Sequence, residues 1–153
     1  MVQPIPQGFS ALTPHLSVSP CKEAIAFYER AFGAKLHASA PMPGTDLLIH
    51  AQMDIQGAIF MLADVFPQWG GTGPKDLKGS CVTLHLYVDD VDAWMKRAEE
   101  NGATIAMPAA DMFWGDRYGK IIDPFGHHWS IATHIADPTP EEMEAAMKAM
   151  MGP

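Results

Sequence analysis

The alternation of apolar and polar residues predicts a strand that occurs twice in the chain. Residues 13–18 and 83–88 share the pattern Thr-x-His-Leu-x-Val and lie seventy positions apart. In both segments apolar residues alternate with polar ones, a period of two that is typical of a strand with one buried face. The polar set comprises Thr13, His15 and Ser17 in the first copy and Thr83, His85 and Tyr87 in the second. We therefore predict two equivalent strands whose polar sides surround a common site.

The same order of elements follows each copy of this strand. A helix is predicted from Ser19-Pro20 to Gly33, because a serine cap and an early proline favour its start and a glycine its end. After it we predict a strand at 35–40 and a hairpin of 47–54 and 58–63 that turns at 56–57. The second half repeats this plan with a helix from 89 to 101, a strand at 104–107 and a hairpin of 117–122 and 128–133 that turns at 123–126.

Two glycines of the first half also return in the second. Gly33 corresponds to Gly102 and Gly57 to Gly126, both at a spacing of sixty-nine residues. Landmarks in register indicate an internal duplication, so we predict an α+β fold of two tandem βαβββ modules. The predicted boundaries are 1–64 for the first module, 65–79 for a linker loop, 80–137 for the second module and 138–153 for a C-terminal helix.

The C-terminal helix is predicted from a capping box, since Thr139 is followed three residues later by Glu142. Its Met/Ala-rich side would be exposed unless its own domain or a dimer partner covers it. The linker contains several glycines and prolines together with Trp69, and it is predicted to be a surface loop or a lid.

Composition and charge exclude several classes of protein. The net charge of −8 and the pI near 5.2 argue against a nucleic-acid partner, which requires clustered lysine and arginine. No apolar run approaches the length of a membrane span, and residues 1–6 lack the features of a signal peptide, so we expect a cytoplasmic protein that does not enter the membrane. Two cysteines make no disulfide framework; Cys21, at a predicted helix start, is either a reactive thiol or an ordinary helix residue.

Two segments resemble a known superfamily. Ala-Ile-Ala-Phe-Tyr-Glu-Arg-Ala-Phe-Gly-Ala (24–34) and Asp-Pro-Phe-Gly-His-His-Trp (123–129), set in paired βαβββ modules, resemble the vicinal oxygen chelate proteins. That superfamily includes glyoxalase I, fosfomycin- and bleomycin-resistance proteins and extradiol dioxygenases. His50-Ala51, 113–119 and 129–134 are similar to its PhnB-like branch. The resemblance covers nearly the whole chain and implies a homodimer, with the sheets of two modules curled around one cleft.

The resemblance also implies where metal-dependent members bind their ion. Each module of those members gives one ligand from its first strand and one from its last. In this chain these positions are Thr13, Met61, Thr83 and Ser130. None of them is His, Glu or Asp, so we expect the usual metal site to be absent and no metal cofactor to be needed.

Alternation along the predicted strands gives a set of candidate cleft residues instead. The set consists of Thr13, His15, His50, Gln52, Thr83, His85, Tyr87, Arg117, His128 and Ser130, with Trp69 and Trp114 at the mouth. The preferred interpretation is metal-free binding of a small organic molecule, with Arg117 clamping a carboxylate or phosphate-like group. Metal-free catalysis, with His15 or His85 as the general base, is compatible with the same residues.

Two alternatives stay open. In one, His15, His85 and either His50 or His128 form a relocated site for Zn²⁺, Ni²⁺ or Fe²⁺ in a lyase, isomerase or dioxygenase. In the other, individual histidines such as His37, His127 and His134 are polar groups that bond to neighbouring residues and have no further role. Arg117 would then form an ion pair with Asp116 or Asp123.

Overall fold

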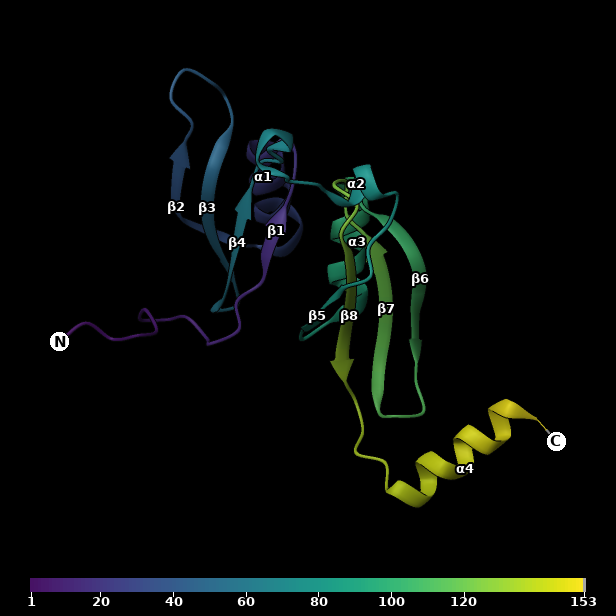
Figure 1. Ribbon diagram of the computed structural model, residues 1–153. Helices are drawn as coiled ribbons and strands as arrows, with labels where there is room; N and C mark the ends of the chain where they lie inside the picture. The colour runs from purple at the N-terminus through teal and green to yellow at the C-terminus, as the bar shows by residue number, and fades with distance from the viewer. Residues whose placement is uncertain (153) are drawn as a thin grey trace.

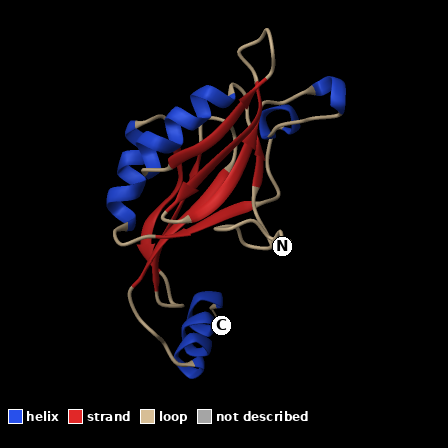
Figure 2. Ribbon diagram, turned by 90° about the vertical axis from the view of Figure 1, so that its left-hand side faces the viewer, coloured by secondary structure: helices blue, strands red, loops and turns tan. Residues whose placement is uncertain are grey.

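The structure, a computed structural model that describes residues 1–152, contains two four-stranded sheets side by side, with two long helices packed on one side of them (Figures 1 and 2). The first module comprises β1 (His15–Ser17), α1 (Cys21–Phe32), β2 (Lys35–Pro41), β3 (Leu48–Ile55) and β4 (Ala58–Ala63). The second comprises β5 (Thr83–Tyr87), α3 (Val91–Glu100), β6 (Thr104–Asp111), β7 (Asp116–Ile122) and β8 (His128–His134). The linker holds the 3-10 turn η1 (Pro67–Trp69) and the short helix α2 (Pro74–Leu77), and α4 (Pro140–Met151) ends the described chain.

The two sheets have the same topology. Their strand orders are β1-β4-β3-β2 and β5-β8-β7-β6, with the first strand of each module parallel to its last strand and the other pairs antiparallel. The predicted α+β fold of tandem βαβββ modules is therefore confirmed. Its strands form two sheets whose edges, β1 and β5, lie next to each other (Figure 1).

The largest differences from the predicted strand boundaries are in β1 and β6. β1 is shorter than expected and leaves Thr13 in the preceding loop. β6 runs on to Asp111 although Pro108 suggested an earlier end. β6 is an edge strand, where a proline is tolerated because the sheet does not need its missing N–H donor.

An aromatic core joins the two modules. The rings of Phe32 and Trp129 lie 5.0 Å apart between centroids, and those of Tyr28 and Trp129 lie 5.7 Å apart. The Tyr28 hydroxyl and the Trp129 indole N–H both donate to Oδ2 of Asp123, at 2.6 and 2.9 Å. Because residues of both modules contribute to this cluster, the modules share one core. Each buried aromatic ring stabilises the fold by about 1.5–3 kcal/mol.

Cys21 lies fully inside this core. Burial, together with the nearby charge of Asp64, raises the pKa of its thiol to about 12. A thiol with such a pKa is not a nucleophile at neutral pH, so the structure supports the ordinary helix residue over the reactive one.

The tail helix α4 begins as predicted, with Thr139 and Glu142 exchanging the two hydrogen bonds of a capping box. Figure 2 shows α4 set apart from the two sheets. None of its residues is buried by the rest of the chain, and Met147, Met150 and Met151 are exposed. A single chain thus leaves the apolar side of α4 uncovered; the predicted 138–153 segment ends one residue outside the described part. Among residues 1–152 there is no helix with the length and apolar character that crossing a membrane requires.

Candidate functional site

Each module presents a polar sheet surface on the side away from α1 and α3, which we call the open face. Leu16 of β1 is buried in the core, and alternation therefore directs His15 to the open face. His15 lies directly opposite Met61 on β4, and His85 lies opposite Ser130 on β8. In both modules the histidine thus stands beside the last-strand position at which the resemblance places a metal ligand.

The first module pairs two imidazoles on its open face. The rings of His15 and His50 lie 6.0 Å apart between centroids and nearly at right angles. Burial, and to a lesser degree the charge of His50, lowers the pKa of His15. Gln52 continues the row, since it lies opposite Met61. Thr13 takes no part in it, because its hydroxyl donates to the carbonyl of Ser10 at 3.1 Å.

The second module surrounds its histidine with a hydroxyl and two phenol rings. Nδ1 of His85 lies 2.6 Å from Oγ of Ser130, which is buried. The His85 ring is perpendicular to Tyr87 at 4.6 Å and stacks on Tyr118 at 6.0 Å. Burial lowers the pKa of His85, and the negative charge of Asp116 partly opposes this shift. His85 is therefore held as a neutral, oriented imidazole at neutral pH.

A buried carboxylate organises the end of this surface. Asp116 accepts hydrogen bonds from the Tyr87 hydroxyl at 3.2 Å, the Trp114 indole at 3.0 Å and Nδ1 of His134 at 2.8 Å. Burial alone would raise its pKa, but the hydrogen bonds from His134, Trp114 and Tyr87 outweigh it and lower the pKa. Tyr87 and Trp114 were predicted from the sequence as members of this site, whereas Asp116, Tyr118 and His134 were not.

Lys120 was missed as well. It lies opposite Ser130 on β7, so His85, Ser130 and Lys120 form one row across the second open face. In the strand pairing, Tyr118 and Lys120 correspond to His50 and Gln52 of the first module, but the sequence spacing of the repeat misses this correspondence by one residue.

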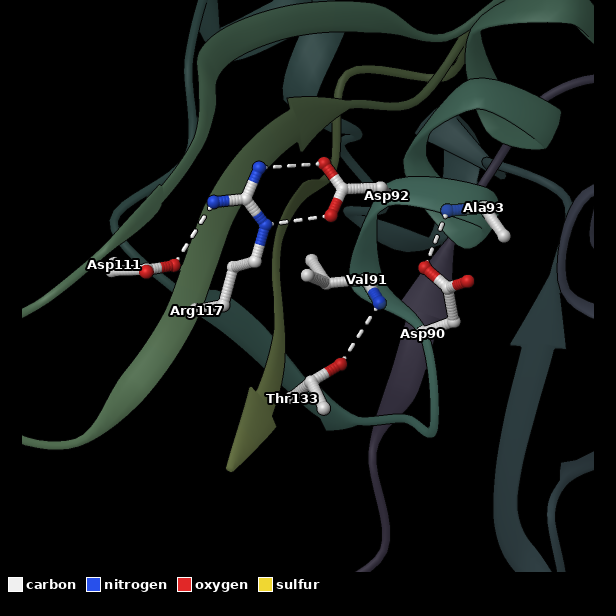
Figure 3. A network of polar contacts seen from close by, with 7 residues as sticks. All are labelled: Asp90, Val91, Asp92, Ala93, Asp111, Arg117 and Thr133. Carbon is white, nitrogen blue, oxygen red and sulfur yellow. Dashed lines mark hydrogen bonds and ion pairs between the residues drawn. The ribbon is translucent and has the colours of Figure 1, made fainter. Parts of the chain in front are cut away.

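Arg117 does not lie on the open face, and the predicted ligand clamp is wrong. Its guanidinium forms a two-pronged ion pair with Asp92 of α3 at 2.6 and 2.9 Å, and a further bond to Asp111 at 2.9 Å (Figure 3). These bonds raise the pKa of Arg117 and lower the pKa of Asp92. The reason is the alternation of β7, which places Asp116 and Tyr118 on the open face and Arg117 on the helix side. The alternative of an ion pair is supported, although its partners are Asp92 and Asp111.

The remaining predicted residues are spread along the molecule. Thr83 and His128 lie opposite one another at the start of β5 and β8, two residues before the row of His85 and Ser130 and on the same face. Trp69 is exposed in the linker and packs on Phe66, with ring centroids 4.8 Å apart. His127 bonds to a neighbouring residue, as the alternative without a ligand-binding role expects for it. Its Nε2 lies 2.9 Å from the carbonyl oxygen of Ser17.

Two cavities lie along the seam between β1 and β5. A cavity of about 510 Å³ is bordered by His15 and by the linker around Pro74, and one of about 280 Å³ is bordered by His85 and Phe60. Pro14 and Leu84 line both cavities. Neither lining includes Asp, Glu, Lys or Arg, so the seam suits an uncharged and largely apolar molecule with groups that bond to imidazole.

The histidines of the relocated metal site are not brought together by one chain. Within residues 1–152 no group of three or more His, Cys, Asp or Glu side chains has the spacing to hold a metal ion. His15 and His50 form a pair, and His85 lies in the other module with Ser130 and Tyr118 as neighbours.

Comparison with known proteins identifies the family. The model of the Glyoxalase/Bleomycin resistance protein/Dioxygenase superfamily matches residues 11–131. The chain belongs to this superfamily. An uncharacterized protein of Mycobacterium bovis is 45% identical over 142 residues, which cover 91% of this chain and 93% of that protein.

Solved structures agree with the fold. An Arabidopsis thaliana gene product superposes with a TM-score of 0.66 at 28% identity, covering 81% of this chain and 98% of that one. A PhnB protein from Bacillus cereus superposes with a TM-score of 0.61 at 17% identity, covering 81% and 99%. At that identity the PhnB protein supports the shared fold alone. The superfamily match ends at residue 131, within β8 and before α4.

Proposed function

We propose that this protein binds a small, uncharged organic molecule in the seam between its two modules, with His15 and His85 as the polar contacts. The observation that carries the proposal is the pair of adjoining cavities, one bordered by each histidine and both without charged lining residues. Small-molecule sites typically occupy about 300–1,000 Å³ and combine apolar walls with a few polar groups, a description that the larger cavity meets.

The electrostatics of the histidines support this assignment. The pKa values of His15 and His85 are lowered mainly by burial, which leaves both imidazoles neutral near pH 7. A neutral imidazole carries one donor and one acceptor, so it can bond to a carbonyl, hydroxyl or amide of a ligand. An uncharged ligand also avoids the cost of moving an ion from water into an apolar cavity.

We place the protein in the PhnB-like branch and expect a homodimer in solution. The assignment to this branch rests on the similar segments around His50 and at 113–119. The expectation of a dimer is supported by exposed aromatic side chains that a second copy could cover: Tyr87 and Trp114 of the second open face are 60% and 37% exposed in the single chain. Light scattering after size exclusion tests it, and a monomer across micromolar concentrations would refute it.

A metal-dependent lyase, isomerase or dioxygenase is the second candidate, and the approach of His15 and His50 favours it. Two imidazoles at this spacing are suitable ligands for Zn²⁺, Ni²⁺ or Fe²⁺, but further ligands would have to come from a second copy. Elemental analysis of protein purified without a chelating column tests this candidate. Close to one metal ion per dimer site would favour it, and less than about a tenth of that would reject it.

A thermal-shift screen of neutral aromatic and heteroaromatic compounds, followed by titration calorimetry of the hits, tests the binding function. Hits should bind wild type and be recovered chemically unchanged. His15→Ala and His85→Ala should each weaken binding by about 5- to 20-fold, the loss expected for one hydrogen bond to a neutral group.

His37→Ala is the matched control, because His37 pairs with Asp54 at 2.7 Å and lines neither cavity. It should leave the affinity unchanged. Equal losses of affinity in all three variants, or hits whose affinity is unchanged in both His15→Ala and His85→Ala, would contradict the proposed site. Consumption of a hit by wild type but not by His85→Ala would show catalysis instead.

A further inference from the structure

His134, at the end of β8, lies between two carboxylates. Its Nδ1 is 2.8 Å from Oδ1 of Asp116, and its Nε2 is 3.0 Å from Oδ1 of Asp137. An ionised carboxylate can only accept a hydrogen bond, so each ring nitrogen must carry a proton to make both bonds. A neutral imidazole has a single N–H. The geometry therefore requires His134 to be an imidazolium cation when both bonds are formed.

The groups around His134 favour this cation. The hydrogen bonds that His134 donates to Asp116 and Asp137, followed by the charges of these carboxylates, raise the pKa of His134 above its ordinary value. The neighbouring titratable groups on other elements are Tyr87, which bonds to Asp116, and His85, whose ring lies against Tyr87. Neither carries a positive charge at neutral pH, so nothing on β5 opposes the protonation of His134.

The two carboxylates belong to different parts of the molecule. Asp116 is 4% exposed and orients Tyr87 and Trp114 on the second open face. Asp137 lies in the segment that leads from β8 to α4, where its side chain is 97% exposed. His134 thus connects Tyr87 and Trp114 of the second open face, through Asp116, to the start of the tail.

The same segment is fastened to the turn between β6 and β7. The amides of Ile135 and Ala136 both donate to the carbonyl of Gly115, at 2.8 and 3.0 Å. Gly115 has a positive φ of 100°, and a Cβ atom there would collide with the carbonyl oxygen of Ala136. Tail and turn are therefore in close contact next to Trp114, so a change in one displaces the other.

Deprotonation would break one bond of the pair in preference to the other. Asp116 is buried and needs its donors, so a neutral His134 keeps its proton on Nδ1. The unprotonated Nε2 then faces the carboxylate of Asp137, and two acceptors repel each other. Because Asp137 is exposed, it can turn away into water at little cost.

We propose that Asp116, His134 and Asp137 form a pH-sensitive clasp that holds the tail leading to α4 against the aromatic end of the second open face. Below the ordinary histidine pKa of about 6.5 the clasp is fully formed in the folded protein. As pH rises through the raised pKa of folded His134, the contribution of the clasp to stability is lost. The segment from Asp137 onward is then released, while Ile135 and Ala136 stay bonded to Gly115. The clasp does not depend on the proposed binding function.

Two ligand-free measurements test the clasp in the full chain. NMR titration of the ring protons should give His134 a pKa above the ordinary histidine value of about 6.5. Amide exchange of residues 135–139, corrected for the intrinsic effect of pH, should rise by about two- to fivefold across the His134 titration, as expected on loss of one exposed ion pair.

Asp137→Asn is the decisive variant because it leaves the buried Asp116 untouched. It should lower the pKa of His134, abolish the pH step in tail exchange and keep the indole N–H signal of Trp114 in place. Asp54→Asn, which alters the His37 pair, should leave the tail unchanged. A His134 pKa at or below the ordinary value of about 6.5, or a pH step that persists in Asp137→Asn, would overturn the proposal, whatever the outcome of ligand screens.

Discussion

The two modules share a frame but differ on their open faces. In both, a side chain near the end of the last strand accepts from the first backbone N–H of the helix: Asp64 accepts from Cys21 at 3.0 Å, and Thr133 accepts from Val91 at 2.9 Å. The frame has kept this cap although the residue type has changed. By contrast, the side chains beside the first-strand histidine differ between the modules both in residue type and in polarity.

In the first module the histidine faces a second imidazole and a thioether. In the second it faces a hydroxyl, phenol rings and the carboxylate of Asp116. His15 is thus in a soft, weakly polar environment, whereas His85 belongs to a network that extends to the tail. Duplication supplied two equivalent positions, and the neighbours gave them different electrostatics.

The largest effect should come from the aspartates at the two hairpin turns. Asp123 is buried and accepts from Tyr28, Trp129 and two backbone amides, so Asp123→Ala leaves several buried donors without partners. We expect a loss of about 3–5 kcal/mol in the free energy of unfolding, measured by urea denaturation. Asp54→Ala, in the corresponding turn, loses only bonds to Gly57 and His37 and should cost about 1 kcal/mol. Similar costs for both would refute this asymmetry.

The hydroxyl beside His85 should have a smaller effect. Ser130→Ala removes the 2.6 Å contact to Nδ1 and should destabilise the protein by about 1 kcal/mol. Met61→Ser places a hydroxyl at the equivalent position beside His15. NMR of the imidazole nitrogens should show that Ser130→Ala loosens the tautomer of His85 and that Met61→Ser fixes that of His15. Unchanged tautomer populations in both variants would contradict the role given to this position.

The smallest effects should be opposite shifts in histidine titration. The charge of His50 lowers the pKa of His15, so His50→Ala should raise it. The charge of Asp116 raises the pKa of His85, so Asp116→Asn should lower it further. Ring-proton titration by NMR follows both groups at once. Shifts of the same sign would show that burial changes, rather than these neighbours, dominate.

The sequence predicted the architecture because the repeat is carried by local signals. The helix starts and stops, the glycines at turns and the alternation in β1 and β5 are all short-range features. His15, His50 and Gln52 were placed correctly on the open face for the same reason. What a single chain does with its Met-rich tail was not predictable from these signals.

The error at Arg117 came from one residue of register. The glycines of the two hairpin turns match at Gly57 and Gly126, but β7 pairs with β8 one residue away from the register that this match implies. At the repeat spacing of sixty-nine residues, Asp54 corresponds to Asp123 and Ile59 to His128. Asp54 pairs with Ile59, but His128 pairs with Ile122, one residue before Asp123. A shift of one residue exchanges the two faces of a strand, which selected Arg117 in place of Tyr118 and Lys120.

The roles of Asp116 and His134 were hidden for a different reason. Their bonds join β5, the turn before β7, β8 and the tail, which are far apart in sequence. No spacing pattern in one strand reports such a network, since it arises only when the second sheet and the tail are assembled.

The most direct test of a seam site shared by both modules is to follow the ring signals of His15 and His85 while a single neutral aromatic hit is titrated in. The account predicts that both histidines shift with one dissociation constant, whereas His37 stays still. Movement of only one histidine, or of neither, during saturable binding would contradict it.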